Sequence, residues 1–149
     1  MTPLRLLLVN AAATWFLTGL IWVIQVVHYP LFSFADRATY PAFAAAHGRL
    51  ITVVVGPMML VELVTTALLL SERPAAFPQS WAWGGALLLG VIWLSTALLQ
   101  VPMHTQLASG YDAQAHGWLV GSNWLRTVAW TLRSLLLLAA LSRALQPAT

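Results

Sequence analysis

Four long apolar segments, almost free of charged residues, constrain the fold of this chain more than any other feature of its sequence. They cover about residues 3–28, 41–70, 80–104 and 112–145, and polar or proline-containing stretches separate them. At about 1.5 Å of rise per residue, each segment forms a helix that can cross the roughly 30 Å hydrocarbon core of a bilayer. The sequence therefore predicts an all-α fold, a four-transmembrane-helix antiparallel bundle, in which residues 1–149 form a single transmembrane domain.

The composition agrees with a membrane protein and argues against several other classes. Of the 149 residues, 60% are hydrophobic and 7% are charged, whereas charged residues make up about a quarter of a soluble domain. The seven basic residues are all arginines, and they form no basic stripe with interleaved aromatics, which argues against nucleic-acid binding. The absence of cysteine excludes disulfides, iron–sulfur clusters and thiol catalysis. We expect the lipid bilayer and a hydrophobic small molecule as partners.

Local signals place the ends of the segments. His28-Tyr29-Pro30 should end the first helix, because the residue before a proline is disfavoured in the helical region. Tyr40-Pro41 should open the second, since a proline is tolerated in the first turn, and Gly56-Pro57 should interrupt it. Asp112 is a candidate N-cap for the fourth helix.

The four histidines are distributed one per segment. His28 and His104 lie at the ends of the first and third segments, and His47 and His116 lie near the starts of the second and fourth. In an antiparallel bundle all four therefore come to one membrane face. Imidazole is the commonest protein ligand for zinc, copper and iron, and four imidazoles would fill a tetrahedral or square-planar shell, while two would hold a haem. We predict a transition metal (copper, iron or zinc), with haem as the alternative, held by His28, His47, His104 and His116.

Other polar side chains near this face fit supporting roles. Gln25, Gln100 and Tyr40 are the predicted cofactor-binding side chains, and with Asp36 and Asp112 they would hydrogen-bond the imidazoles and fix their tautomers. A plainer interpretation is that each histidine only contacts lipid headgroups or loop carbonyls. The sequence contains no HExxH motif and no histidine box, so no single motif decides between the two.

Each predicted helix also carries its polar residues on one face. Advancing by about 100° per residue groups the following residues with the histidine of their helix: Asn10, Thr14, Thr18 and Gln25 with His28; Glu62 and Thr65 with His47; Thr96 and Gln100 with His104; Asn123, Thr127, Trp130 and Ser134 with His116. Lipid tolerates such faces poorly, so they should face one another inside the bundle.

Glu62 should lie at membrane depth, about 20 Å along its helix from His47. A carboxylate there needs a partner, either Arg126 or Arg133, or a proton. One interpretation makes Glu62 a proton path for catalysis. The other makes it a structural ion pair between the second and fourth helices, and the available arginines favour this one.

The second half of the chain carries a recognisable pattern, T-x3-Q-x-P-x-H-x2-L, a short turn with an acidic residue, and N-W-x-R-T. Its residues are Thr96, Gln100, Pro102, His104, Leu107, Asn123, Trp124, Arg126 and Thr127. This half resembles the small four-helix membrane proteins grouped with fungal anthrone oxygenases, a family known largely as a domain of unknown function. The resemblance implies oxygenation of a polycyclic phenolic substrate, with His104, Asn123 and Arg126 in the pocket. The chain departs from the family at Met103-His104-Thr105, where asparagine is frequent.

These features together predict a metal- or haem-dependent membrane oxidoreductase or oxygenase that acts on a lipid-soluble, aromatic or quinone-like compound. Glu62, Asn123 and Arg126 are its expected catalytic residues. The alternative is a non-enzymatic membrane protein, either a metal or small-solute transporter or an assembly subunit, in which the polar faces only hold the helices together. A transporter would need homo-oligomerisation, because four helices without an inverted repeat form no transport path of their own.

The arginines outside the predicted core indicate an orientation. Arg5, Arg73 and Arg143 lie at the end opposite the histidines, and Arg37 and Arg49 lie at the histidine end. By the positive-inside rule, both termini should be cytoplasmic and the histidine face should point outward. The expected location is a bacterial inner membrane.

Overall fold

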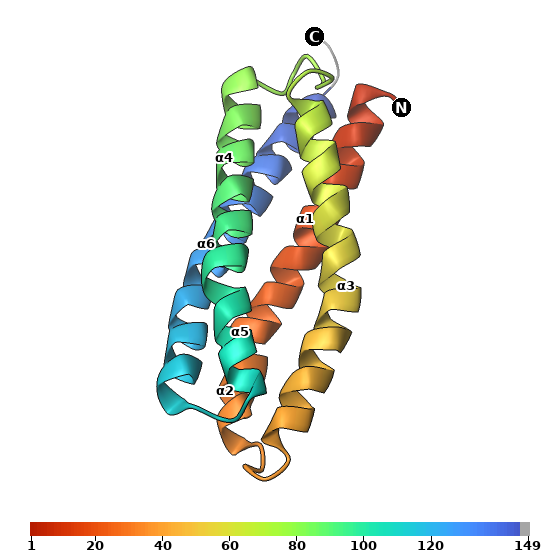
Figure 1. The fold of residues 1–149 in the computed structure, drawn as a ribbon. Helices are drawn as coiled ribbons and strands as arrows, with labels where there is room; N and C mark the ends of the chain where they lie inside the picture. The colour runs from red at the N-terminus through yellow and green to blue at the C-terminus, as the bar shows by residue number, and fades with distance from the viewer. Residues whose placement is uncertain (147–149) are drawn as a thin grey trace.

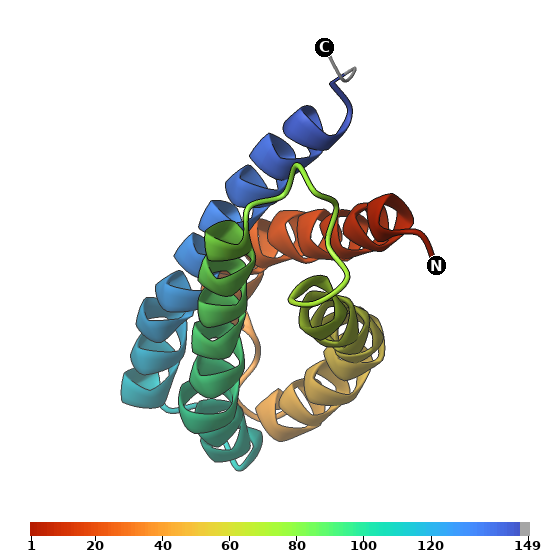
Figure 2. The same cartoon turned by 90° about the horizontal axis from the view of Figure 1, so that it is seen from above.

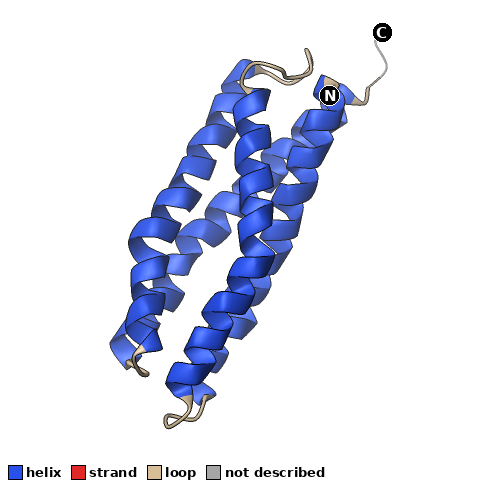
Figure 3. Ribbon diagram, turned by 45° about the vertical axis from the view of Figure 1, so that its right-hand side comes forward, coloured by secondary structure: helices blue, strands red, loops and turns tan. Residues whose placement is uncertain are grey.

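The computed structural model describes residues 1–146 and consists of helices joined by short connections (Figure 1; Figure 3). Four helical segments, Pro3–Phe34, Tyr40–Leu69, Gln79–Ala108 and Ala113–Ala144, are long and apolar enough to cross a membrane. No strand occurs within residues 1–146. The two termini lie at one end of the bundle, and the turns after the first and third segments lie at the other (Figure 1). The predicted all-α fold and four-helix bundle are confirmed.

The first segment continues past the point where the sequence predicted its end. It comprises α1 (Pro3–Val23), a π-helical turn η1 (Ile24–His28), the short α2 (Tyr29–Leu31) and a 3₁₀ turn η2 (Phe32–Phe34). The expected end at His28-Tyr29-Pro30 is therefore wrong. In the π turn the Tyr29 N–H donates to the Ile24 carbonyl, five residues back. This wider turn moves the preceding carbonyls out of the α-helical register, so the Pro30 ring fits and the helix continues.

The third segment has the same construction. It comprises α4 (Gln79–Ser95), the π-helical turn η3 (Thr96–Gln100) and α5 (Val101–Ala108), so it extends four residues beyond the predicted end at residue 104. The Val101 N–H donates to the Thr96 carbonyl, and Pro102 follows at once. Both π turns thus lie directly before a proline at the histidine end of the bundle, and π turns of this kind are frequent at functional sites.

The second and fourth segments are single helices, α3 (Tyr40–Leu69) and α6 (Ala113–Ala144). Pro41 lies in the first turn of α3, as predicted. The predicted span of about 41–70 is confirmed, and at Gly56-Pro57 the chain stays helical, because α3 runs through Pro57. A proline removes one backbone hydrogen bond, and the remaining bonds of this 30-residue helix keep the chain helical. Asp112 caps α6 by accepting a hydrogen bond from the Ala115 N–H (2.6 Å), which confirms its predicted role.

The helices pack against one another unevenly, and the third segment meets α3 more through α5 than through α4. Helix α1 lies against both α3 and α6, and α4 lies against α6, whereas α3 and α4 approach each other only loosely (Figure 2). Two buried apolar clusters fill the ends of the bundle. One contains Leu6, Leu7, Leu69 and Leu137 near the termini, and the other contains Tyr29, Phe32, Leu107 and Leu119 near the histidines. The polar side chains of all four segments lie between and beside these clusters.

Candidate functional site

Three of the histidines come together at the end of the bundle opposite the termini. His28 Nε2 lies 2.9 Å from His47 Nδ1. The ring centroids of His28 and His47 are 4.8 Å apart, and those of His47 and His104 are 5.3 Å apart. His47 is buried, and its Nε2 atom has no hydrogen-bond partner within residues 1–146. The first, second and third segments therefore each contribute one imidazole to this group.

His116 is held apart from the other three. Its Nε2 atom donates to the Tyr29 carbonyl (2.7 Å), and its Nδ1 atom lies 3.2 Å from the Tyr111 hydroxyl. Both nitrogens are thus engaged. Within residues 1–146, no group of three or more histidine, cysteine, aspartate or glutamate side chains is arranged to hold a metal ion. The structure does not bring the four predicted ligands to one point, and metal binding stays a prediction.

Phe32 explains why the four imidazoles do not converge. Its fully buried ring lies 5.3 Å from the ring centroid of His28, 4.9 Å from that of His47, 6.4 Å from that of His104 and 6.3 Å from that of His116. Because the first helix continues through Pro30, Phe32 follows His28 by four residues on the same helical face and projects among the histidines. An aromatic ring occupies the space that a four-histidine metal shell would need.

The centre of the polar interior is a line of hydrogen bonds through Tyr29. The Tyr29 Oη atom lies 2.9 Å from His104 Nε2 and accepts a hydrogen bond from Arg126 Nη2 (3.3 Å). Arg126 also donates from Nε to Asn123 Oδ1 (2.9 Å), and Asn123 Nδ2 donates to Gln25 Oε1 (2.8 Å). These bonds connect the first, third and fourth segments. They fix the guanidinium and the phenol beside each other at membrane depth.

Arg126 has no anionic partner in the part of the chain that the structure describes. Its side chain is 6% exposed, and its contacts are the neutral groups of Tyr29, Asn123 and Thr96. Within residues 1–146, the ion pair between a carboxylate and an arginine is formed by Glu62 with Arg133, and Arg126 takes no part in it. A buried cation is costly unless an anion or strong acceptors compensate it, so the site favours an electron-rich oxygen near Arg126.

A cavity of about 390 Å³ lies beside this line of hydrogen bonds, between α1, α3, the α4–α5 segment and α6. Its polar wall is formed by Tyr29, Trp93, Thr96, Gln100, His104 and Arg126, and the rest of the lining is largely apolar. Thr52, Leu60 and Val101 line the cavity and are also exposed. They lie on α3 and α5, so the cavity reaches the outer surface of the bundle there.

In the part of the chain that the structure describes, the predicted cofactor-binding side chains do not contact the histidines through hydrogen bonds. Gln25 bonds Asn123, and Gln100 Nε2 donates to Ser122 Oγ (2.8 Å). The buried Tyr40 hydroxyl has no partner within residues 1–146. Asp36 accepts a hydrogen bond from the Thr39 hydroxyl, and Asp112 caps α6. None of these five side chains hydrogen-bonds an imidazole among the described residues, and cofactor binding by Gln25, Gln100 and Tyr40 stays a prediction.

Tyr29 and Tyr111 hold the imidazoles instead, and sequence reasoning missed both. The predicted end of the first helix at His28-Tyr29-Pro30 gives Tyr29 no role inside the bundle, whereas the π turn keeps it in a helix and directs it inward. A signal was present in the sequence, since Gln25, Tyr29 and Phe32 follow the i, i+4, i+7 spacing of one helical face.

Glu62 belongs to a separate network nearer the termini. Arg133 Nε donates to Glu62 Oε1 (2.9 Å), which also accepts from the Thr14 hydroxyl (2.6 Å), and Trp130 Nε1 donates to Glu62 Oε2 (3.1 Å). The carboxylate is fully buried. The predicted pairing with Arg133 is confirmed, whereas Arg126 is not its partner. Glu62 does not line the cavity, which favours its structural interpretation.

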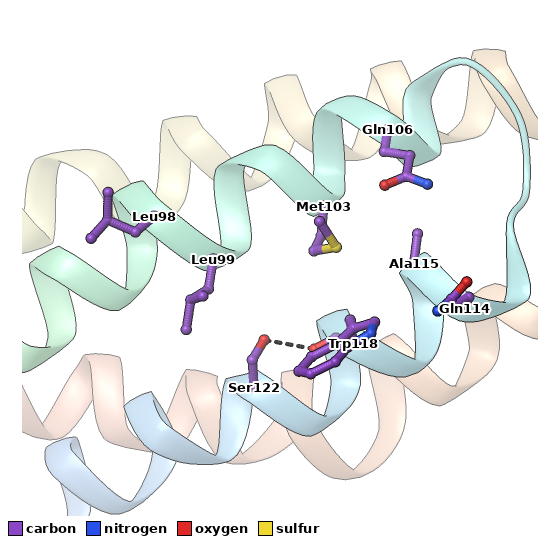
Figure 4. Close-up of a pocket in the computed structure, with 8 residues that line it drawn as sticks. All are labelled: Leu98, Leu99, Met103, Gln106, Gln114, Ala115, Trp118 and Ser122. Atoms are coloured by element: carbon purple, nitrogen blue, oxygen red, sulfur yellow. Dashed lines mark hydrogen bonds between the residues drawn. The ribbon is translucent and has the colours of Figure 1, made fainter.

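A second, outer hollow of about 320 Å³ lies between the third and fourth segments (Figure 4). Its lining residues are Leu98, Leu99, Met103, Gln106, Gln114, Ala115, Trp118 and Ser122. Trp118 and Leu98 are well exposed, so this hollow lies on the outside of the bundle. Ser122 links it to the interior, because its hydroxyl donates to the Trp118 carbonyl (Figure 4) and accepts a hydrogen bond from Gln100.

Comparison of the chain with protein-family models, with curated proteins and with solved structures gives no match. The resemblance to the anthrone oxygenase group therefore stays a prediction, and the functional argument rests on the side chains around the cavity.

Proposed function

We propose that this protein is a membrane oxidoreductase or oxygenase that binds a lipid-soluble aromatic or quinone-like compound in the cavity beside Arg126. The observation that carries the proposal is the buried Arg126 guanidinium, which has no carboxylate partner among the described residues and lines the cavity. A carbonyl or phenolate oxygen would accept hydrogen bonds from its planar fork and would compensate its charge.

The shape and lining of the cavity support a flat, apolar ligand. Its volume of about 390 Å³ falls in the range of small-molecule sites. Trp93 and Trp130 line it together with aliphatic side chains, and such walls accommodate aromatic rings. Because Leu60 and Val101 on its rim are exposed on the lipid-facing side, a compound dissolved in the bilayer has access to the cavity.

Tyr29, Arg126 and Asn123 have distinct roles in this proposal. Arg126 orients the ligand oxygen, Asn123 holds Arg126 through Nε, and Tyr29 presents its hydroxyl between Arg126 and His104. An oxygenation would use dioxygen as the oxidant, and dioxygen is also soluble in the hydrocarbon of a bilayer.

We further propose that His28, His47 and His104 bind a transition metal, which would supply one-electron chemistry if it were copper or iron and would act as a Lewis acid if it were zinc. The buried and unpartnered His47 Nε2 supports this, since it is a nitrogen that a metal would use. His28 and His47 hydrogen-bond each other directly, which leaves no room for a haem between them, so copper, iron or zinc is favoured over haem. His116 takes no part, because both of its nitrogens are engaged.

The proposed location is a bacterial inner membrane, with cytoplasmic termini and the histidine end facing outward. The distribution of Arg5, Arg73 and Arg143 against Arg37 and Arg49 supports this orientation.

The ligand part of the proposal is tested by titrating detergent-purified protein with 2-methyl-1,4-naphthoquinone and following tryptophan fluorescence, since Trp93 and Trp130 line the cavity. We expect quenching in the wild type. We expect roughly 10- to 100-fold weaker binding in Arg126→Met, because hydrogen bonds to a charged group contribute about 1.5–3 kcal/mol. Arg143→Met, which changes an exposed arginine on the same helix, is the control. Equal affinity in both variants would overturn the proposal.

The metal part is tested by elemental analysis of untagged protein. We expect about one metal ion per chain, most of which is lost in His47→Ala and in His104→Ala and retained in Glu62→Gln. Equal metal content in the three variants would contradict a histidine site.

A second candidate function is a structural membrane subunit, and the Glu62–Arg133 network favours it. Thr14, Glu62, Arg133 and the Gly85 carbonyl join four helices in that network, and none of these four residues lines the cavity, which the network meets only at Trp130. A protein that binds neither the naphthoquinone nor a metal would favour this function.

A further inference from the structure

Gln100 lines the cavity, and its neighbours fix the orientation of its side-chain amide. Gln100 Nε2 lies 2.8 Å from Ser122 Oγ. The Ser122 hydroxyl carries a single proton, and it donates that proton to the Trp118 carbonyl at 2.6 Å. Ser122 can therefore only accept from Gln100, so the NH₂ group of the amide points to Ser122 and the carbonyl oxygen is the other end.

This carbonyl oxygen is buried without a partner within residues 1–146. The side chain of Gln100 is 1% exposed and lines the cavity, and Oε1 accepts no hydrogen bond from any described residue. A buried acceptor without a donor is costly. Because Oε1 has no proton, a ligand satisfies it only by donating one, through a hydroxyl or an N–H.

Trp93, seven residues before Gln100 on the same segment, lines the cavity with a hydrogen-bond donor instead of an acceptor. Its Nε1 atom is also buried without a partner within the described chain, and Trp93 also lines the cavity. An indole N–H donates, so it is satisfied equally by a phenol oxygen and by a quinone carbonyl. Trp93 thus does not distinguish the two forms of a ligand, whereas Gln100 does.

We infer that Gln100 is a specificity-determining residue, whose Oε1 accepts a hydrogen bond from a ligand hydroxyl and makes the cavity prefer the hydroxyl-bearing, reduced form of an aromatic compound over its carbonyl form. This inference rests on the proposed function, since it assumes that the cavity is the ligand site. The inference makes the reduced compound the substrate and the oxidised compound the product. The oxidised product lacks the hydroxyl proton that Gln100 recognises, so the product binds less tightly than the substrate.

The inference is tested with two ligands that share a ring system and an oxygen, 1-naphthol, which has the hydroxyl proton, and 1-methoxynaphthalene, which lacks it. Their dissociation constants are measured by calorimetry on protein in lipid nanodiscs, with partition into empty nanodiscs subtracted. The quantity compared is the ratio of the two constants, because differences in lipid partition cancel between variants.

In Gln100→Met, which keeps the length of the side chain and removes the acceptor, we expect the preference for 1-naphthol to fall by roughly 5- to 100-fold, the range for leaving a buried polar group unsatisfied. Ser122→Ala should lower the preference by less, because it only frees the amide to rotate. Gln106→Met, a glutamine on the outer hollow drawn in Figure 4, should leave the ratio unchanged. Trp93→Phe should weaken both ligands and leave the ratio within about twofold.

The outcomes separate this inference from the proposed function. Binding of both ligands with the same ratio in wild type and Gln100→Met would overturn the inference and assign Oε1 to a bound water, while the cavity would remain the ligand site. A preference that falls equally in Gln106→Met would overturn it as well. No binding of either ligand to the wild type would overturn both the inference and the ligand part of the proposed function.

Discussion

The buried ion pair between Glu62 and Arg133 gives the sharpest prediction about stability. Arg133 donates from Nε to Glu62 Oε1 (2.9 Å), from Nη2 to the Thr66 hydroxyl (2.6 Å) and to Asn10 Oδ1 (3.2 Å), and from Nη1 to the Gly85 carbonyl. Both side chains are almost completely buried. The substitution Arg133→Met keeps most of the apolar stem and removes all four bonds, so Glu62 is left with Thr14 and Trp130 as donors.

The expected cost follows from leaving one charge unpaired. Removing one partner of a buried ion pair costs about 3–5 kcal/mol, because the remaining charge has lost its water and gained no partner. Removing both partners costs much less, since no unpaired charge remains. We therefore expect Arg133→Met to lower the free energy of unfolding by about 3–5 kcal/mol, and the double variant Glu62→Gln with Arg133→Met to recover at least about 2 kcal/mol of that loss.

The measurement is a double-mutant cycle on the free energy of unfolding. Protein in dodecylmaltoside micelles is titrated with dodecyl sulfate, helix content is followed by far-UV circular dichroism, and the free energies are extrapolated linearly. Arg143→Met, at an exposed position on the same helix, is the control and should change the free energy by less than about 1 kcal/mol. Costs that simply add in the double variant would refute the argument, because they would show that Glu62 and Arg133 do not compensate each other.

Two further predictions use the same unfolding measurement. A Cβ atom at Gly85 would lie 3.2 Å from Arg133 Nη1, whereas one at Gly84 would meet only a leucine methyl at 3.9 Å. Gly84→Ala should therefore stabilise the protein by up to about 1 kcal/mol through helix propensity, and Gly85→Ala should be less stable than Gly84→Ala. Equal effects of the two substitutions on the free energy of unfolding would contradict the close approach at Gly85. Asp112→Ala should cost about 1 kcal/mol, because the Ala115 N–H loses its cap, whereas Asp112→Asn should cost much less, and similar losses in both would contradict the cap.

The sequence predicted the bundle well, because its main signals are strong and local. Lipid requires every backbone polar group to be bonded within the chain, so four apolar segments of this length leave few alternatives to four helices. The start of α3 and the Asp112 cap followed from proline and aspartate chemistry. The polar face of each helix was also visible, since its residues repeat with the helical period. These signals do not show whether a helix ends at a proline or continues past it.

The errors at the site come from two π turns. Each inserts a wider turn before a proline, and the sequence signal of a proline is the same whether the helix ends there or adapts. A first helix that ends at His28-Tyr29-Pro30 gives Tyr29 and Phe32 no place on its inward face. In the structure Tyr29 contacts Arg126, and Phe32 lies among the histidines that were expected to meet. The misplaced end of the first helix therefore accounts both for the role of Tyr29, which the sequence did not reveal, and for the predicted convergence of all four histidines.

Two buried arginines of the same helix differ in the groups that compensate their charge. Arg126 and Arg133 are seven residues apart on α6, so they lie on one face, two turns from each other, and both are buried. Arg133 is matched by a carboxylate, two neutral side-chain acceptors and a backbone carbonyl from three other helices, as expected for a group that only holds a bundle together. Arg126 meets only neutral side chains of the described residues and lines a cavity. All three side-chain nitrogens of Arg126 have neutral acceptors, so its charge is compensated less fully than that of Arg133. In the proposed function, an oxygen of the ligand in the cavity would supply the remaining compensation, and this contrast between the two arginines supports that proposal.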